Sequence, residues 1–368
     1  MRGGYKSKRR VFSNRVISVG AIAVVLCAVV CVMFSQDACG QTSRYSVSEI
    51  QAAGVPNGLN NLGEIAGRAV DPATGEGRAT KWNHGGLRRN ILGKLAGGDY
   101  SSASKINDAG QIAGAGNISN SIVPFIWASG AGFRRIPLLP GDNCGQATAI
   151  NKFGHVVGYS SGPHGKKAFL WKRGNSVNDL GVLPGGSYST ASDVNDSDDV
   201  VGASGSTAGD RAVLWTNTGK IIDLGTLPGD VSSEATAINN NGTVIGYSKG
   251  FQGIRAFVWT QASGMQQLGA LPGGISSRAL AINDTETVVG ASTTASGDRA
   301  FVWTKQTGIR DLNAEGSLVF GAVLLEAHAI NNRGQILALG INTHEMGNDS
   351  DSSLCAPAPP SGFLLSPQ

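Results

Sequence analysis

Residues 234–274 read EATAINNNGTVIGYSKGFQGIRAFVWTQASGMQQLGALPGG, and this stretch decides the fold. It contains four short segments of small apolar, β-branched or aromatic residues, each bounded by turn-forming residues, which is the pattern of short β-strands. The segments cover residues 234–239, 243–248, 255–260 and 265–271. Because no part of the stretch shows the 3.6-residue periodicity of an amphipathic helix, we expect almost no helix.

The same unit recurs along the chain. All six tryptophans lie 44 or 45 residues apart, at Trp82, Trp127, Trp171, Trp215, Trp259 and Trp303. The asparagine that ends the first segment recurs seven times, at Asn60, Asn107, Asn151, Asn195, Asn239, Asn283 and Asn331. Four strands in about 44 residues are the size of a propeller blade, so the sequence predicts an all-β, seven-bladed β-propeller. An open β-solenoid with polar caps is the alternative.

The strand count predicts how the ring closes. The first three segments occur seven times if residues 362–365 form the last third strand, but only six fourth segments lie between the first and last units. The unmatched one, residues 45–50, precedes the first unit. We therefore expect the N-terminal strand (about 45–50) to pair with the C-terminal strand (about 362–366), which leaves no open sheet edge. Residues 41–368 would form one domain, with an inserted loop at 346–361 in the last blade.

The turn after the first strand has a specific chemistry. In Asn239-Asn240-Asn241-Gly242 the first side chain can accept a hydrogen bond from a backbone N–H two residues on, and the glycine suits a left-handed conformation. Asp198 and Glu286 occupy the glycine position in two units. Since glutamate tolerates that conformation less well than aspartate, we expect a strained or rearranged turn at Glu286.

The aromatic residues of the third strand are expected to fill the gaps between blades. Each is a large apolar body, and small residues such as Ala235 and Ala237 on the first strand would let seven sheets crowd near the axis. A platform on which a ligand stacks is the alternative for these aromatic residues.

The first 40 residues resemble a targeting segment. The basic run KSKRR precedes residues 16–34, a stretch of 19 residues without a charge. Ala38-Cys39-Gly40 then offers small residues for signal-peptide cleavage before Gln41. An uncleaved membrane anchor through residues 16–34 is the alternative, because the stretch is just long enough to span a bilayer. Both interpretations predict export.

Charge and cysteine content limit the function of the rest. Subtracting the six bases and one acid of residues 1–40 from totals of 30 and 26 leaves 24 bases and 25 acids, which argues against nucleic-acid binding. Only Cys144 and Cys355 remain, too few for a disulfide framework or a structural zinc site. A Cys144–Cys355 disulfide is compatible with export, and two unpaired thiols are the alternative.

No motif of established chemistry appears. The chain lacks a hydrolase triad order, a phosphate-binding loop, a zinc signature and a dinucleotide fingerprint, and its five histidines are not at metal-ligand spacing. Residues 195–199 (NDSDD) resemble a calcium loop but lack its distal glutamate. The sequence therefore predicts no catalytic residues, no metal and no cofactor.

One end of the predicted ring has the character of a binding face. Glycine-rich loops that join each fourth strand to the next blade gather there, as does the residue five positions before each asparagine. This residue varies between units while the framework does not, which is typical of a binding face on a fixed scaffold; freely varying solvated loops are the alternative. The candidate ligand-binding residues are Tyr100, Gln146, Tyr188, Thr190, Glu234, Arg278 and Glu326.

The repeated unit resembles the HAF repeat, a probable extracellular repeat of exported bacterial proteins. Residues 167–169, 255–257 and 299–301 match its His-Ala-Phe triplet with lysine or arginine in place of histidine, and residues 179–181 and 223–225 read Asp-Leu-Gly. The resemblance implies export and a propeller-like fold. It implies no activity and no catalytic residues.

Three functions are consistent with these observations. The first is a non-enzymatic exported scaffold that binds a glycan or a cell-surface or extracellular protein through the loop end. The second is a carbohydrate-active enzyme, a glycosidase or lyase, with Glu234 and Glu326 as acid and base at the channel mouth. The third is a purely structural envelope protein.

Overall fold

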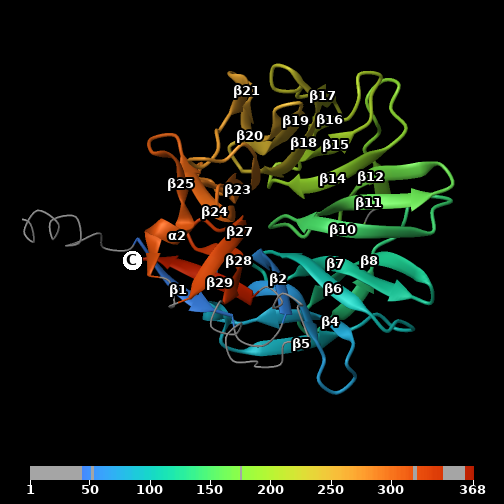
Figure 1. Ribbon diagram of the computed structural model, residues 1–368. Coiled ribbons are helices and arrows are strands. Elements are labelled where there is room, and N and C mark those ends of the chain that lie inside the picture. Colours follow the sequence, from blue (N-terminus) through green and yellow to red (C-terminus); the bar gives the residue numbers. More distant parts are fainter. Residues whose placement is uncertain (1–43, 51–53, 175, 318–320, 343–360) are drawn as a thin grey trace, which may run out of the picture. The chain divides into compact units, whose positions relative to one another are not determined.

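The computed structural model describes residues 44–50, 54–174, 176–317, 321–342 and 361–368. Seven antiparallel sheets are arranged in a ring, so the predicted seven-bladed β-propeller is confirmed (Figure 1). In each blade the first strand lies toward the centre of the ring and the fourth toward its outside (Figure 1). Residues Arg44–Gln368 form one compact unit.

The first four blades follow one another along the chain. Blade 1 consists of β2 (Gly54–Leu59), β3 (Ile65–Val70), β4 (Gly77–Trp82) and β5 (Arg89–Gly93). Blade 2 consists of β6 (Ser101–Ile106), β7 (Ile112–Ile118), β8 (Ser121–Ala128) and β9 (Gly132–Arg135). Blade 3 consists of β10 (Cys144–Ile150), β11 (Val156–Gly162), β12 (Gly165–Trp171) and β13 (Val177–Asp179). Blade 4 consists of β14 (Ser189–Val194), β15 (Val200–Ser204), β16 (Arg211–Trp215) and β17 (Ile221–Asp223).

The last three blades include the chain ends. Blade 5 consists of β18 (Asp230–Ile238), β19 (Val244–Gly250), β20 (Gly253–Thr260) and β21 (Gly264–Gln267). Blade 6 consists of β22 (Ser277–Ile282), β23 (Val288–Thr294), β24 (Gly297–Thr304) and β25 (Gly308–Asp311). Blade 7 consists of β27 (Ala322–Ile330), β28 (Ile336–Asn342), β29 (Ser361–Pro367) and β1 (Tyr45–Glu49), and β26 (Gly316–Ser317) lies parallel to β1. The described helices are the short η1 (His84–Gly86) and α2 (Leu312–Glu315).

In blade 7 the strand from the N-terminal side lies beside the C-terminal strand. β1 runs antiparallel to β29, with Tyr45 opposite Pro367 and Glu49 opposite Phe363. That this pairing holds the ring closed stays a prediction. The inserted loop (346–361) lies outside the described residues except for Ser361.

The aromatic residues form the core between blades, as predicted. Five third-strand phenylalanines have no exposed surface: Phe125, Phe169, Phe257, Phe301 and Phe363. Four tryptophans are buried, at Trp82, Trp171, Trp215 and Trp259, while Trp127 and Trp303 are partly buried and pack on the same clusters. Each cluster combines residues of two neighbouring blades; Phe257 of blade 5, for example, packs with Val201 of blade 4. Packing of this kind fixes the blades relative to one another.

A glycine of the second strand lies opposite the bulge of the first strand in six blades, and Ala338 takes this place in blade 7. In all seven blades the register shifts within the first strand, as between Ala235 and Ala237 in β18. A Cβ atom added to Gly246 in β19 would lie 2.0 Å from the carbonyl oxygen of Glu234. Because a side chain would clash at that distance, Gly246 lets the bulged strand approach the second strand closely in this blade.

The turn after the first strand keeps one conformation whether or not it contains glycine. Gly242 has φ 80°, and Asp198 and Glu286 have φ 64° and 59° at the equivalent position. The backbone N–H of Glu286 still donates to the carbonyl of Asn283 at 3.1 Å, as Gly242 does to Asn239 at 3.1 Å. The turn at Glu286 is therefore strained but not rearranged.

Two columns of buried serines connect strands in a way that sequence analysis did not anticipate. The hydroxyl of Ser233 accepts a hydrogen bond from the backbone N–H of Ala212 at 2.9 Å, and that of Ser248 accepts one from Leu227 at 3.1 Å. The equivalents of the first serine are Ser101, Ser189 and Ser277, and those of the second are Ser160, Ser204 and Ser292. These bonds satisfy backbone N–H groups of the third strand, such as that of Ala212, and of the loop between blades, such as that of Leu227.

In the part of the chain that the structure describes, which does not include residues 16–34, no helix is long and apolar enough to cross a membrane. The predicted signal peptide or anchor lies outside the described residues.

Candidate functional site

The two ends of the propeller differ in the residues they present. The turns after the first strands, which contain the seven asparagines, form one end, called the turn end. The loops between blades and the loops between second and third strands form the other, called the loop end, and the candidate residues predicted from the sequence belong to the loop end.

At the loop end three residues of blades 5 and 6 form a polar cluster. The hydroxyl of Tyr247 donates to a carboxylate oxygen of Glu234 at 2.5 Å. The guanidinium carbon of Arg278 lies 5.8 Å from the centre of the Tyr247 ring, within the range of a cation–π contact. Burial, together with the hydrogen bond to Glu234, raises the pKa of Tyr247 well above its ordinary value, so this hydroxyl stays a donor at physiological pH.

Tyr188 extends the cluster toward blade 4. Burial and then hydrogen bonding to Asp210 raise the pKa of Tyr188, and the negative charge of Glu234 acts in the same direction. The influence of Glu234 on both tyrosines places Tyr188, Glu234 and Tyr247 in one electrostatic neighbourhood.

Between blades 6 and 7 the loop end contains a cavity of about 470 Å³. Its charged lining residues are Arg278, Asp298 and Glu326, and its other walls include Ile254, Leu325, Leu339 and several serines. Burial raises the pKa of the Glu326 carboxyl, Arg278 lowers it, and Asp298 raises it. The cavity can therefore offer a hydrogen-bond donor, two carboxyl groups and apolar walls to a small group, which is the usual make-up of a ligand site.

The structure brings together four of the seven candidate residues predicted from sequence. They are Tyr188, Glu234, Arg278 and Glu326, which follow one another over blades 4 to 7. Thr190 lies opposite Ala203 in blade 4. The remaining two make separate contacts: Gln146 accepts from the hydroxyl of Tyr159 at 3.5 Å, and Tyr100 stacks under Arg68 at 5.8 Å.

Sequence analysis missed Tyr247 and Asp298. Tyr247 lies opposite Glu234 on the second strand, as Tyr159 lies opposite Gln146. The signal was the tyrosine thirteen residues after Gln146 and again after Glu234, a spacing that marks the cross-strand partner once the bulge is known. Asp298 lies on β24, and its place beside Glu326 depends on the neighbouring blade.

Cys144 is half-buried at the loop end and forms no disulfide with any described residue. Its sulfur lies 3.6 Å from the carbonyl oxygen of Ser161. Cys355 lies outside the described residues, so the predicted Cys144–Cys355 disulfide is not tested.

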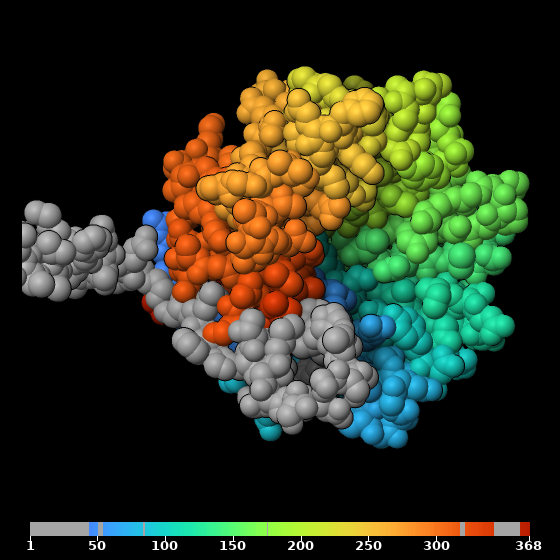
Figure 2. Space-filling view, in the orientation of Figure 1, coloured from blue at the N-terminus to red at the C-terminus, as the bar shows by residue number. Residues whose placement is uncertain are grey.

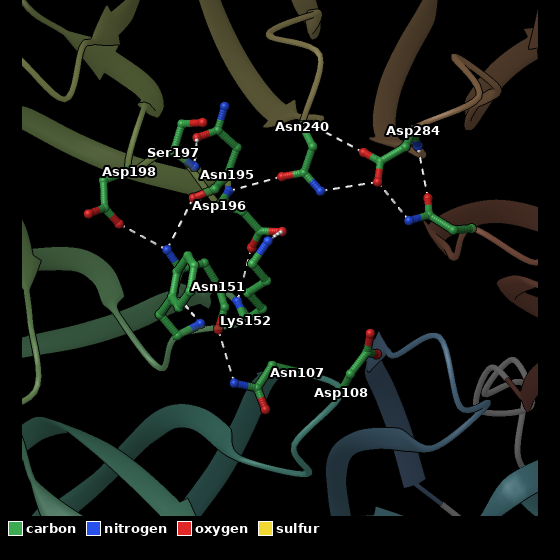
Figure 3. A network of polar contacts seen from close by, with 12 residues as sticks. Asn107, Asp108, Asn151, Lys152, Asn195, Asp196, Ser197, Asp198, Asn240 and Asp284 are labelled. Carbon is green, nitrogen blue, oxygen red and sulfur yellow. Dashed lines mark hydrogen bonds and ion pairs between the residues drawn. The ribbon is translucent and has the colours of Figure 1, made fainter.

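At the turn end the seven asparagines form a ring of hydrogen bonds, of which Figure 3 shows the part that contains Asn107, Asn151 and Asn195. The side-chain amide of each donates to the backbone carbonyl of the asparagine in the next blade at 2.9–3.4 Å, and Asn331 donates to Asn60. The side-chain oxygen accepts from its own turn, as Asn239 does from the N–H groups of Asn241 and Thr243. Each of the seven is 3–6% exposed, so the ring is a buried structural device.

The residue that follows each asparagine lies at the rim of the turn end. Its backbone N–H donates to the side chain of the equivalent residue in the next blade, except at one position. The backbone N–H of Asp196 donates to the side-chain oxygen of Asn240, and the backbone N–H of Asn240 donates to a carboxylate oxygen of Asp284 (Figure 3). Lys152 interrupts the pattern, because lysine has no acceptor atom. Inside the rim lies a cavity of about 200 Å³, across which Lys105 and Asp193 form an ion pair at 2.6 Å.

In residues 195–199, the segment that resembles a calcium loop, Asp198 has partners other than a metal ion. Asp198 accepts from His155 at 2.7 Å and is paired with Lys172 at 2.7 Å. Although burial raises the pKa of Asp198, these two contacts lower it overall. Within the described residues no group of three or more His, Cys, Asp or Glu is placed to hold a metal ion.

No family model matches the chain. No curated protein matches it either. The resemblance to the HAF repeat therefore rests on the motifs of the chain alone.

Solved structures with the same architecture are similar to the chain at 9–11% identity. They include a prolyl endopeptidase (TM-score 0.56, 10% identity, 88% of this chain and 52% of that chain) and virginiamycin B lyase from Staphylococcus aureus (0.52, 9%, 88% and 98%). A third is YCF48 bound to D1 peptide (0.50, 11%, 89% and 96%). The chain spans about half the length of the endopeptidase. At this identity the likeness concerns the fold alone.

Proposed function

We propose that this protein is an exported, non-enzymatic β-propeller that binds a partner through its loop end. The partner would be a glycan or a cell-surface or extracellular protein. The observation that carries the proposal is the cavity of about 470 Å³ beside the Tyr188–Glu234–Tyr247–Arg278 cluster, on a scaffold whose blades are locked together. A concave site with a few fixed polar groups suits recognition.

The contacts of the acids favour binding over catalysis. Glu234 is engaged by Tyr247, and the positive charge of Arg278 acts on Glu326. Such partnered carboxylates are more typical of a recognition or ion-pair cluster than of an acid–base pair. The chain's propeller neighbours include one bound to a peptide and one named as a lyase, so the fold is compatible with either role.

A carbohydrate-active enzyme is the second candidate, and a specific observation favours it. Burial raises the pKa of Glu326, which is the direction that a general acid needs. We test it with Glu234→Gln/Glu326→Gln, assayed for release of reducing ends and of unsaturated products from a polysaccharide panel. We expect no turnover from either protein; turnover by the wild type that the variant lacks would establish the enzyme.

The binding function is tested by thermal shift with glycan and peptide panels. A ligand that binds the folded state raises the melting temperature by mass action. At a ligand concentration of one hundred times Kd, the free energy of unfolding rises by about 2.7 kcal/mol. We expect at least one panel to give a hit that Arg278→Ala abolishes. Panels that give no hit while the protein melts cooperatively would contradict the proposal and support a purely structural envelope role.

Export is tested separately. The full chain, expressed in a Gram-negative host, is fractionated and its N-terminus sequenced. We expect the protein outside the cytoplasm with Gln41 as its first residue. Retention of residues 16–34 in the membrane fraction would instead identify an anchor, and cytoplasmic protein would contradict export.

A further inference from the structure

Three large apolar side chains are exposed together at the loop end. Phe251 is fully exposed (101%), Ile275 is 78% exposed and Val231 is 59% exposed. Leaving apolar surface exposed to water costs roughly 25 cal/mol per Å² relative to burying it. We call these three residues the apolar patch. Single exposed apolar residues are ordinary on a protein surface, but several on adjacent loops indicate an interaction site.

The backbone holds the three residues near one another on blades 5 and 6. Phe251 lies in the hairpin between β19 and β20. Val231 lies in the bulge of β18 opposite the end of β19, because Asp230 pairs with Gly250 and Ser232 with Lys249. On the other side of the hairpin, a Cβ atom on Gly253 would lie 3.4 Å from the carbonyl oxygen of Ile275.

The apolar patch borders the cavity between blades 6 and 7. Ile254 and Ser276 follow the hairpin and Ile275 in the chain, and their backbone N–H and hydroxyl are 3.3 Å apart. Both residues line the cavity, together with one guanidinium, that of Arg278, and the two carboxyl groups of Asp298 and Glu326. An occupant of patch and cavity thus meets an apolar surface beside a pocket with an excess of negative charge.

We propose that patch and cavity together dock an extended segment of a partner protein. The segment places an apolar side chain on Phe251, Ile275 and Val231, and a lysine or arginine in the cavity against Asp298 and Glu326. This inference rests on the proposed binding function and names its partner class. A protein fits better than a glycan, because Val231 and Ile275 are aliphatic and give a sugar's hydroxyl groups no hydrogen-bond partner, whereas all three patch residues bury apolar side chains well. The charge of the cavity selects the basic residue.

The test is a selection of random 12-residue peptides displayed on phage against the full chain in a mild non-ionic detergent. We expect enriched peptides to carry a large apolar residue within three positions of lysine or arginine. A synthetic copy of one such peptide is then measured by fluorescence anisotropy. We expect its binding to weaken at least tenfold on replacing its basic residue by glutamine, and several-fold when NaCl rises from roughly 50 to 500 mM.

Protein variants separate the patch from the rest of the surface. We expect Phe251→Ser and Asp298→Asn each to weaken peptide binding at least tenfold. Both side chains are exposed, so neither change should affect folding. The matched controls are Phe153→Ser and Glu286→Gln, which alter an exposed phenylalanine and an exposed acid at the turn end, and we expect binding to be unchanged.

Three outcomes overturn the inference. They are a selection that enriches no sequence, enriched peptides without basic residues, and peptide binding that Phe251→Ser and Asp298→Asn leave intact. If peptides fail while a glycan binds at the loop end and Arg278→Ala abolishes that binding, the proposed function stands and only the protein partner is wrong. If neither binds, both are wrong.

Discussion

At the scale of single residues, each repeated asparagine has two roles, and only one is visible in the sequence. The spacing in Asn239–Gly242 predicts the turn in which the side-chain oxygen of Asn239 accepts from Asn241, and the structure confirms it at 3.1 Å. The amide of the same side chain donates to Asn283, 44 residues away. That bond depends on the blades being neighbours in the ring, so no local pattern reveals it.

Replacing Asn239 by alanine tests the ring of asparagines. The change removes one bond to the next blade and two within the turn, and it leaves buried backbone groups without partners. We expect a loss of about 2–4 kcal/mol in the free energy of unfolding, measured by urea denaturation. The control is Asn178→Ala at an exposed position, where we expect a change within about 0.5 kcal/mol. Equal effects would show that the ring contributes little.

His328 gives a second prediction, on pH. Burial lowers its pKa to about 4 from 6.5, against the opposing effect of its hydrogen bond to the carbonyl of Pro56 at 2.8 Å, and its Nδ1 is buried without a partner. The folded state thus favours the neutral ring. Its contribution is fully present above pH 6.5 and is lost as pH falls from 6.5 toward 4.

The measurement compares wild type with His328→Gln, which keeps a donor for Pro56 but does not titrate. We expect the free energy of unfolding of the wild type to fall between pH 7.5 and 4.5 by up to about 3 kcal/mol more than that of the variant. Parallel pH profiles would show that His328 is solvated when protonated.

At the scale of elements, the sequence predicted the strands and their core but not all that fixes them. Hydrophobic segments and turn residues located four strands per unit, because apolar patterning is local. The serine columns were missed because Ser233 and Ser248 lie among other polar residues in the sequence, although they are 3% and 0% exposed. Their partners, Ala212 and Leu227, belong to the preceding blade.

Gly246 provides the prediction at this scale. Replacing it by alanine forces a Cβ atom to within 2.0 Å of the carbonyl oxygen of Glu234, so β18 and β19 must separate. We expect a loss of about 3 kcal/mol or more in the free energy of unfolding, read from thermal or urea melts. Gln266→Ala, at an exposed position of the same blade, should have almost no effect. Blade 7 has Ala338 at the equivalent position opposite Ala327, so a stable Gly246→Ala variant would mean that the bulge of β18 adjusts as that of β27 does.

For the whole molecule, counting strands predicted the number of blades, whereas the arrangement of the candidate residues needed the structure. Seven asparagines and six tryptophans fix the architecture because a repeat adds one blade at a time. The candidate residues belong to the loop end, yet only four of the seven come together. How these four residues come together depends on cross-strand partners such as Tyr247 and on Asp298 of β24 in the neighbouring blade. Spacing along the chain does not reveal these contacts.

The closure of the ring is the prediction that belongs to the whole molecule. Ser46 of β1 lies directly opposite Ser366 of β29. Residues so paired have Cα atoms about 4.5–5.5 Å apart, within the range of a disulfide. In an open solenoid, the alternative architecture, the two chain ends would be far apart. We therefore expect the double variant Ser46→Cys/Ser366→Cys to form, on oxidation, a cross-link between positions 46 and 366, identified by peptide mass spectrometry.

The cross-link should also stabilise the protein. Because it joins residues about 320 positions apart, it restricts the unfolded chain strongly, and we expect a gain of about 2–4 kcal/mol, or about 5 °C in melting temperature. The same variant in its reduced form is the control, since it differs only in the bond. If the link does not form, or forms without raising the melting temperature, the β1–β29 pairing does not close the ring. The interface bonds from Asn331 to Asn60 and from His328 to Pro56 would then hold blades 7 and 1 together on their own.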